Sequence, residues 1–433
     1  MQYTSKSLDQ FHSSINIGTK LSFFRKLLAF SGPGFLVAVG YMDPGNWATD
    51  IAGGSQFGYT LLSVILISNL FAMLLQHLAL KLGIVTGRDL AQICRDHFPK
   101  PITILLWLMA EIMIIACDLA EVIGSAIALN LLFGIPLQIG VLITAFDVIL
   151  LLILLQKGFR YLEIIVILLI TTILSCFGLE ILFSQPSLQP LLAGFLPSTS
   201  IITNPEMLYI AVGILGATVM PHNLYLHSAV VQTRKYPHTT EGKREAIKFS
   251  TIDSTIALFL AFFVNAAILI VAAATFHVNG FHEVAEIEQA HHILSPLVGV
   301  AAASTIFALA LLASGQNSTI TATLAGQVIM EGFLKIRMKP WLRRIITRLL
   351  AIIPAVAVLQ IYGGKGLGDL LILSQVILSL QLSFAVFPLV FFTNKQKLMK
   401  QFANPLWIKI SAIAIACIIA ILNIWLVTNV IFS

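Results

Sequence analysis

The stretch Gly40-Tyr-Met-Asp-Pro-Gly-Asn46 interrupts a long hydrophobic run near the start of the chain. Proline has no backbone N–H, so Pro44 leaves the carbonyl of Gly40, four residues earlier, without its helical hydrogen bond. Within a bilayer, such freed backbone groups are tolerated only where they line a cavity or are buried in protein. A carboxylate (Asp43) and a carboxamide (Asn46) flank the break. Together these features indicate a cation site inside a broken helix.

The composition is that of a membrane protein. The chain has 433 residues, of which 58% are hydrophobic and only 11% charged, whereas soluble proteins carry about 25% charged residues. Its four cysteines show no paired spacing, so we interpret them as packing residues. The polar first 20 residues lack the pattern of a signal peptide.

Eleven stretches are long and apolar enough to cross a bilayer, which requires about 20 residues each. We therefore predict an all-α polytopic membrane protein with eleven transmembrane helices. The predicted spans are 28–54 (broken), 59–82, 104–133, 137–156, 161–183, 206–231 (broken), 253–277, 295–329, 345–362, 368–393 and 407–431.

The positive charges predict the orientation. With eleven spans, 25 of the 26 Lys and Arg residues fall on one side of the membrane, and only Lys365 falls on the other. The positive-inside rule then places the N-terminus in the cytoplasm and the C-terminus outside. The predicted external loops 184–205 and 278–291 contain no Lys or Arg.

A second break lies in the sixth span, at Ala217-Thr-Val-Met-Pro-His-Asn223. Here Pro221 frees the carbonyl of Ala217, and Met220 adds a thioether. Interrupted helices at corresponding positions of two halves indicate an inverted-repeat transporter with its site near the midplane. We predict repeats over 28–183 and 206–393, a cytoplasmic segment over 1–27 and an additional helix over 407–431. Two ordinary proline kinks are the simpler alternative.

The ligand types point to a transition metal. Asp43, Asn46 and the Ala217 carbonyl offer oxygen, which alkali and alkaline-earth ions prefer, whereas a thioether favours transition metals. If Met220 is a ligand, the ion is a divalent transition cation such as Mn²⁺ or Fe²⁺. If Met220 only fills space, which is the usual role of methionine, the chemistry leaves the ion open.

Three motifs resemble those of the NRAMP family (natural resistance-associated macrophage protein). They are Asp43-Pro-Gly-Asn46, Met220-Pro-His-Asn223 and the segment Gly315-Gln-Asn-Ser-Thr-Ile-Thr-Ala-Thr-Leu-Ala-Gly-Gln-Val-Ile-Met-Glu-Gly-Phe333. The resemblance extends from about Leu28 to Asn429 and implies a proton-coupled divalent-metal transporter with a LeuT-like fold. It also implies that Asp43, Asn46, the Ala217 carbonyl and Met220 bind the metal.

Proton coupling needs titratable groups inside the membrane, where carboxylates are costly and usually functional. Span three supplies three of them on one helical stripe, and Arg348, with Arg344 one turn away, lies at the cytoplasmic end of span nine. The resemblance favours Asp118, Glu121 and Arg348 as a proton exit route and Asp43 as the proton acceptor. A purely structural ion-pair network is the alternative. The candidate proton pathway is Asp43, Glu111, Asp118, Glu121, His222, His227, Arg344 and Arg348.

Several polar residues are ambiguous. His222 and His227 suit a proton relay or pH sensor, or they orient helices through hydrogen bonds. Gln76 and Gln375 are candidates to complete the metal site, or they join helices. Ser383 replaces the usual family proline in span ten. The loop with His282, Glu286 and other acidic and histidine residues can concentrate cations, but a solvated loop is the simpler interpretation.

We therefore predict a monomeric inner-membrane protein, not an enzyme, that imports Mn²⁺ and Fe²⁺ with protons by alternating access. It would use no cofactor and bind no nucleic acid. A sodium-coupled amino-acid carrier is the main alternative, although Asp43 puts a negative charge where a substrate carboxylate would need a positive one. A membrane-embedded hydrolase would need more His and carboxylate ligands than the breaks offer, and a receptor or scaffold would leave both breaks unexplained.

Overall fold

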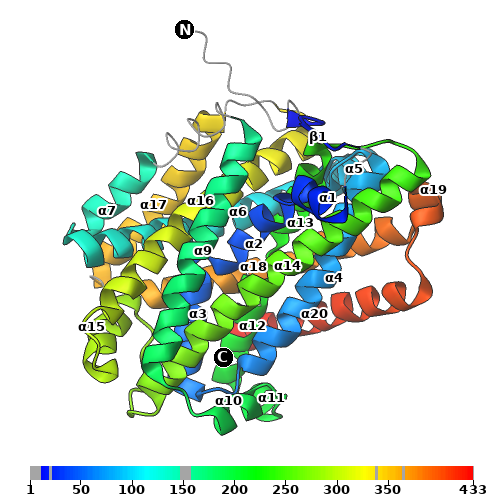
Figure 1. Ribbon diagram of the computed structural model, residues 1–433. Helices are drawn as coiled ribbons and strands as arrows, with labels where there is room; N and C mark the ends of the chain where they lie inside the picture. Colours follow the sequence, from blue (N-terminus) through cyan, green and yellow to red (C-terminus); the bar gives the residue numbers. More distant parts are fainter. Residues whose placement is uncertain (1–10, 19–21, 147–157, 337–339, 363–365, 433) are drawn as a thin grey trace.

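The structure, a computed structural model, describes residues 11–18, 22–146, 158–336, 340–362 and 366–432. These residues form a bundle of helices (Figure 1). Two strands of two residues, β1 (Ile15–Asn16) and β2 (Arg234–Lys235), pair in parallel and hold the N-terminal segment against the loop after the sixth span. The predicted all-α class is confirmed.

The first half of the chain contains α1 (Phe23–Phe30), α2 (Pro33–Ala38), η2 (Val39–Met42), α3 (Pro44–Phe57), α4 (Leu62–Thr86), α5 (Leu90–His97), α6 (Lys100–Phe133), α7 (Leu137–Ile143), η3 (Thr144–Phe146), α9 (Phe159–Ser184), α10 (Leu188–Gly194) and α11 (Ser200–Thr203). The second half contains α12 (Pro205–Val219), α13 (Pro221–Val230), η4 (Val231–Thr233), α14 (Thr240–Ala272), the π-helical turn η5 (Ala273–His277), α15 (Ile287–Val298), α16 (Ala303–Leu334), α17 (Pro340–Tyr362), α18 (Leu367–Asn394), α19 (Gln396–Met399), η6 (Lys400–Phe402) and α20 (Leu406–Phe432).

Most of the predicted spans coincide with helices of the structure. Within the described residues, seven helices are long and apolar enough to cross a membrane, and an eighth span results if the bent pair Phe23–Phe30 and Pro33–Met42 is counted as one. Of the other predicted spans, α16 has a middle rich in Ser and Thr, and α17 has a shorter apolar part, Ile345–Ile361. The fourth predicted span begins with α7 and η3, and its residues 147–156 lie outside the described residues.

Two predicted boundaries differ from the structure. Helix α14 begins at Thr240 rather than at 253, because Thr239 caps it by accepting a hydrogen bond from the Gly242 N–H. The predicted eighth span, 295–329, overlaps two helices, because α15 ends at Val298 and α16 begins only at Ala303. The glycine at 299 has a φ of 75°, a left-handed conformation that commonly ends helices.

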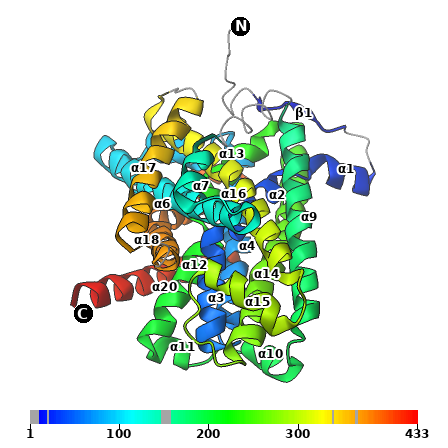
Figure 2. The same cartoon turned by 90° about the vertical axis from the view of Figure 1, so that its left-hand side faces the viewer.

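Both predicted breaks are present. Helix α3 starts with Pro44 at its first position and with Asp43 as N-cap, whose side chain accepts a hydrogen bond from the Asn46 N–H. Helix α12 ends at Val219, and α13 restarts with Pro221. In Figure 2, α2 and α13 lie in the upper half of the bundle and α3 and α12 in the lower half, so both breaks lie at mid-height.

Small residues let other helices approach the breaks. A Cβ on Gly124 of α6 would lie 2.1 Å from the Pro44 Cβ, so α6 passes directly against the first break. A Cβ on Gly216 of α12 would lie 2.3 Å from the Gln375 carbonyl oxygen, so α12 packs backbone to backbone against α18. Such close approach is what small residues provide at membrane helix interfaces.

A buried ionic cluster fixes the start of α2; we call it the α2 anchor and define it as Glu163, Arg234 and Asp253. Glu163 pairs with Arg234 at 2.6 Å, and Arg234 also donates to the Ser31 carbonyl at 2.6 Å. Asp253 accepts hydrogen bonds from the backbone N–H groups of Gly32 (3.2 Å) and Gly34 (2.7 Å). The anchor therefore ties the first half of the broken span to α9, α14 and β2.

Candidate metal site

The two breaks meet through a direct hydrogen bond. The Asn46 Nδ2 donates to the Ala217 carbonyl oxygen at 3.2 Å, across 171 positions of sequence. The Ala217 carbonyl is the one that Pro221 deprives of its helical partner, as the sequence predicted. Asp43, Asn46, Ala217 and Met220 are all at most 1% exposed. The structure thus brings the two predicted halves of the site together in a closed interior.

Two buried side-chain oxygen atoms at the first break have no hydrogen-bond partner among the described residues and are available to a ligand. The Asp43 Oδ1 accepts the Asn46 backbone N–H at 2.8 Å, which orients the carboxylate. The Asp43 Oδ2 and the Asn46 Oδ1 are buried without a hydrogen-bond partner among the described residues. Buried polar atoms normally have partners, and an unaccompanied one calls for an explanation such as an ion or a water.

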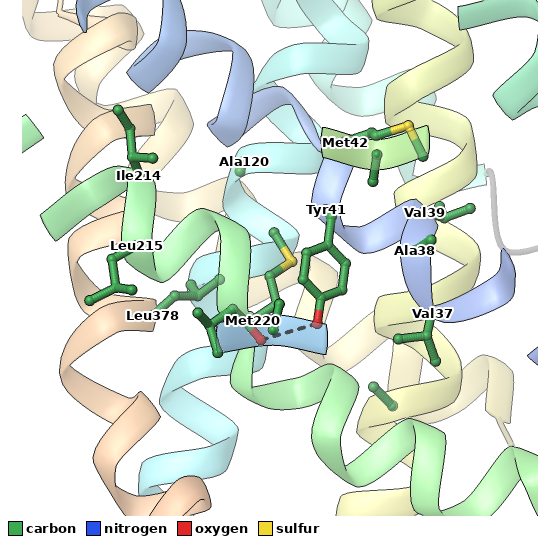
Figure 3. Packing of buried hydrophobic residues seen from close by; sticks show 14 of the residues in the cluster. Val37, Ala38, Val39, Tyr41, Met42, Ala120, Ile214, Leu215, Met220 and Leu378 are labelled. Carbon is green, nitrogen blue, oxygen red and sulfur yellow. Dashed lines mark hydrogen bonds between the residues drawn. The ribbon is translucent and has the colours of Figure 1, made fainter. Parts of the chain in front are cut away.

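Met220 occupies the gap between α12 and α13 in a strained backbone conformation, with φ 37° and ψ 97°. Tyr41 lies next to this gap, because its hydroxyl donates to the Val219 carbonyl at 3.3 Å (Figure 3). The Met220 side chain is fully buried. The thioether of Met220 is thus buried at the break between α12 and α13, three residues from the Ala217 carbonyl that Asn46 contacts.

The two predicted glutamines differ in their surroundings. Gln375 packs on the first break, since a Cβ on Gly45 would lie 1.7 Å from its Nε2, and its Oε1 is buried with no hydrogen-bond partner among the described residues. Gln76 is engaged at both ends: its Nε2 donates to the Tyr41 hydroxyl at 2.7 Å, and its Oε1 lies 2.9 Å from His227 Nδ1. Of the two, only Gln375 has an oxygen available to the site.

Tyr41 and two asparagines also line the breaks, although they were not among the predicted site residues. Asn223 belongs to the quoted motif and packs on the first break, because a Cβ on Gly40 would lie 2.3 Å from its Nδ2. Asn265 on α14 donates to the Tyr41 carbonyl at 2.9 Å. Buried amides within apolar spans were the available signal, but their partners lie far away in sequence.

The predicted acidic stripe of span three is one continuous helix, α6, packed against α17. Glu121 lies 3.5 Å from Arg348 Nη1 and accepts a hydrogen bond from Thr319 at 3.1 Å. The same Arg348 nitrogen donates to the Asp118 carbonyl oxygen at 3.3 Å. Since Glu121 precedes Gly124 by one helical turn, this ionic pair lies about one turn from the contact between α6 and Pro44.

Glu111 pairs with Arg343, an arginine that was not among the predicted residues of the proton pathway. Arg343 contacts both of its carboxylate oxygens, at 2.9 and 3.1 Å, and Trp107 donates to it at 3.0 Å. The side chain of Arg344 lies outside the described residues. The two described pairs, Glu111 with Arg343 and Glu121 with Arg348, form a ladder between α6 and α17.

The two histidines of α13 are both fully buried. His227 contacts Gln76 through Nδ1, so it belongs to the Tyr41–Gln76–His227 chain. Neither ring nitrogen of His222 has a hydrogen-bond partner among the described residues. The structure therefore links His227 to the first break through Tyr41 and leaves the role of His222 a prediction.

Comparison with known proteins gives matches over nearly the whole chain. The family model described as natural resistance-associated macrophage protein-like matches residues 34–429. The divalent metal cation transporter MntH of Listeria welshimeri is 64% identical over 420 residues, which cover 97% of this chain and 94% of that protein. The protein of the same name from Nostoc sp. is 63% identical over 420 residues and covers 97% of this chain and 95% of its own length.

Solved structures agree with these matches. The manganese transporter of Eremococcus coleocola, solved with an aromatic bis-isothiourea substituted compound, superposes with a TM-score of 0.90 at 44% identity, covering 96% of this chain and 90% of that chain. Mhp1, a nucleobase-cation-symport-1 family transporter, shares only the fold, with a TM-score of 0.59 at 15% identity over 92% of this chain and 93% of that chain. The resemblance inferred from the three motifs is thereby confirmed, and the chain belongs to the natural resistance-associated macrophage protein-like family.

Proposed function

We propose that the protein imports Mn²⁺, and Fe²⁺ as a related substrate, into the cytoplasm together with protons by alternating access. The hydrogen bond between Asn46 and the Ala217 carbonyl is the observation that carries the proposal, because it joins the two helix breaks into one site. Relatives named divalent metal cation transporter and a neighbour named manganese transporter support the choice of substrate. The membership of a transporter family agrees with the prediction that the protein is not an enzyme.

The metal ion would bind to side-chain and carbonyl atoms at the two breaks. The ion would take the Asp43 Oδ2, the Asn46 Oδ1, the Ala217 carbonyl and the Met220 sulfur. To do so it would replace the Asn46–Ala217 hydrogen bond as the link between the halves. The carbonyl end of a half-helix favours a cation, as in other transporters with broken helices. The sulfur would favour a transition metal over Ca²⁺ or Mg²⁺.

Proton coupling follows from the same carboxylate. A metal ligand must be deprotonated, so metal binding at Asp43 releases or excludes a proton there. In this proposal the Glu121–Arg348 pair, about one helical turn from the contact between α6 and Pro44, receives that proton through Asp118 or water. The ladder down α6 and α17 would lead it to the side that carries the Lys- and Arg-rich loops. Intramembrane carboxylates paired in this way mark proton routes in other transporters.

The membrane orientation completes the proposal. We place the N-terminus in the cytoplasm and the C-terminus outside, in the inner membrane of a bacterium, with the protein as a monomer. The asymmetry of the Lys and Arg residues supports this orientation. Among the described residues, no three His, Cys, Asp or Glu side chains gather into a metal-holding group, so the hydrolase alternative gains no support.

Uptake into proteoliposomes tests the proposal. Wild-type protein should accumulate Mn²⁺ faster when the outside is acidic, with acidification of the lumen reported by a trapped dye. Asp43→Ala should abolish both signals while retaining the elution profile and thermal unfolding of a folded protein. Glu121→Gln should retain part of the Mn²⁺ uptake but lose the acidification. Normal uptake by Asp43→Ala would exclude this carboxylate as a ligand, and unchanged acidification by Glu121→Gln would exclude the proposed proton route.

A further inference from the structure

The segment between α14 and α16 carries several carboxylates and histidines that the central site does not use. The solvated loop that we expected is wrong for part of it, because the segment contains the helix α15 and two of its carboxylates are withdrawn from solvent. The Glu286 carboxylate accepts the backbone N–H groups of Gly366 (2.6 Å) and Gly368 (2.7 Å), so it caps the start of α18. Glu286 therefore has a structural role as the cap of α18.

Unlike Glu286, neither Glu288 nor His291 has a structural partner for its buried side-chain polar atoms within the described part of the chain. Both carboxylate oxygens of Glu288 and the Nδ1 of His291 are buried with no hydrogen-bond partner among the described residues. The two residues lie three positions apart on α15, so their side chains share one helix face. A carboxylate and an imidazole on the same helix face, at most one turn apart, thus hold three buried ligand atoms that have no hydrogen-bond partner among the described residues.

The spacing is one that metal sites use. Glu-x-x-His pairs on helices supply ligands in carboxylate-bridged metal proteins of the four-helix type. Carboxylate oxygen and imidazole nitrogen together suit Mn²⁺, Fe²⁺, Co²⁺ and Zn²⁺. Because no third His, Cys, Asp or Glu joins them among the described residues, water would fill the other positions. A site with two protein ligands binds weakly and exchanges its ion readily.

The surroundings hold this pair in place. Ser304, in the first turn of α16, donates through its hydroxyl to the His291 carbonyl at 2.6 Å, and its N–H donates to the Ser295 hydroxyl at 2.9 Å. The His291 ring lies 6.4 Å from the Phe307 ring, which lies 5.1 Å from Trp47. Since Trp47 follows Asn46 directly in α3, the Phe307–Trp47 pair connects His291 to the helix that carries the central site.

We propose that Glu288 and His291 form a second, low-affinity site for a divalent transition-metal ion, which we call the α15 site. It lies on the side of the bundle that has few Lys and Arg residues, close to the outer end of α3. Its role as a capture site that feeds the central site rests on the proposed function and orientation. The binding of an ion at the α15 site does not.

The simpler interpretation is that Glu288 and His291 have only a structural role. Glu288 lies in the first turn of α15, where the helix dipole favours a negative charge, and half-buried histidines often serve in packing. A structural role would affect thermal unfolding but would not bind a metal. A measurement of metal binding therefore distinguishes a metal site from a purely structural role.

The test uses the full chain in detergent with the central site disabled by Asp43→Ala and Met220→Ala. Mn²⁺ binding, followed by the loss of the electron paramagnetic resonance signal of the free ion, should reveal a residual weak site. Adding Glu288→Gln or His291→Ala should weaken that site by at least the roughly 10- to 100-fold that even outer partners of metal ligands contribute. Gln289→Ala, which alters an exposed neighbour on the same helix, should leave it unchanged.

Each outcome decides the matter. Absence of residual binding, or residual binding that survives both Glu288→Gln and His291→Ala, would overturn the α15 site without affecting the central site, which is measured separately in the wild type. If His291→Ala unfolds, His291→Gln replaces it, and Co²⁺ absorption bands report whether nitrogen remains bound.

For the capture role, Glu288→Gln in the wild type should raise the KM for Mn²⁺ uptake and leave kcat unchanged. A lowered kcat at unchanged KM would contradict capture.

Discussion

The Met220 residue combines strain with chemistry. A non-glycine residue with φ 37° is unusual, and such conformations cost on the order of 1–3 kcal/mol and gather at functional sites. The conformation arises because α12 must end and α13 restart with Pro221 within a single residue. It leaves the carbonyl end of α12 and the thioether of Met220 at the same gap.

The thioether itself can be tested by Met220→Ala. We expect Mn²⁺ uptake to persist, with discrimination against Ca²⁺ reduced by about tenfold, equivalent to about 1.4 kcal/mol of preferential sulfur binding. Competition between Mn²⁺ and Ca²⁺ in proteoliposomes measures the ratio. Met113→Ala, at an equally buried methionine on α6, is the control and should retain the wild-type ratio. Equal discrimination in both variants would count against the sulfur as a ligand.

The protonation of Glu288 predicts how the α15 site responds to pH. Burial, with a smaller contribution from the charge of Glu286, raises the pKa of Glu288 to about 7. Burial, followed by the charge of His292, lowers the pKa of His291, which favours the neutral imidazole that can bind a metal. Since only the ionised carboxylate binds metal, affinity should approach its full value about one unit above pH 7 and fall by up to about tenfold per pH unit below it.

Mn²⁺ titrations of the Asp43→Ala, Met220→Ala protein between about pH 6 and 8 measure this dependence. In the same background, Glu288→Gln should show no such slope. Affinity that stays constant over this range in the parent would show that Glu288 does not bind the ion.

At the scale of the elements, the α2 anchor decides how firmly the first half of the broken span is held. Arg234 is 1% exposed and Glu163 fully buried, whereas Arg160, which contacts the other carboxylate oxygen at 3.0 Å, is 43% exposed. Breaking a buried ion pair leaves an uncompensated charge, which costs about 3–5 kcal/mol. An exposed partner contributes at most about 1 kcal/mol.

We therefore expect Arg234→Gln to lower the free energy of unfolding by about 3–5 kcal/mol and Arg160→Gln to change it little. Thermal unfolding of the two purified variants in the same detergent compares them directly. Similar shifts for both variants would mean that the anchor is not held by the buried pair.

At the scale of the whole molecule, the one-sided distribution of charge predicts the topology. The chain offers exposed positions on both predicted sides, namely Ser187 between α9 and α10 and Lys397 in α19. Three native thiols are buried and only Cys417 is exposed. In a Cys417→Ala background, Ser187→Cys should react with a membrane-impermeant maleimide in intact cells, and Lys397→Cys only after permeabilisation. The reverse pattern would invert the proposed orientation and the direction of transport.

The sequence predicted the features that depend on the chain locally and on the bilayer. Pro44 and Pro221 break their helices wherever they lie, because the missing N–H is a property of the residue. The long apolar runs and the one-sided Lys and Arg residues likewise reflect the length and the charge asymmetry of the membrane. The resemblance of three motifs to a known family then identified the ligand candidates.

Only the tertiary structure decided which groups face each other. It paired Glu111 with Arg343 and engaged Gln76 between Tyr41 and His227. It also used Glu286 as a helix cap while leaving the oxygens of Glu288 buried without a partner among the described residues. These outcomes depend on how helices distant in sequence rotate and approach, and a periodic apolar pattern does not encode which polar side chain on one helix meets which on another. The sequence therefore determined the breaks and the membrane class, and the packing of the helices determined the partners.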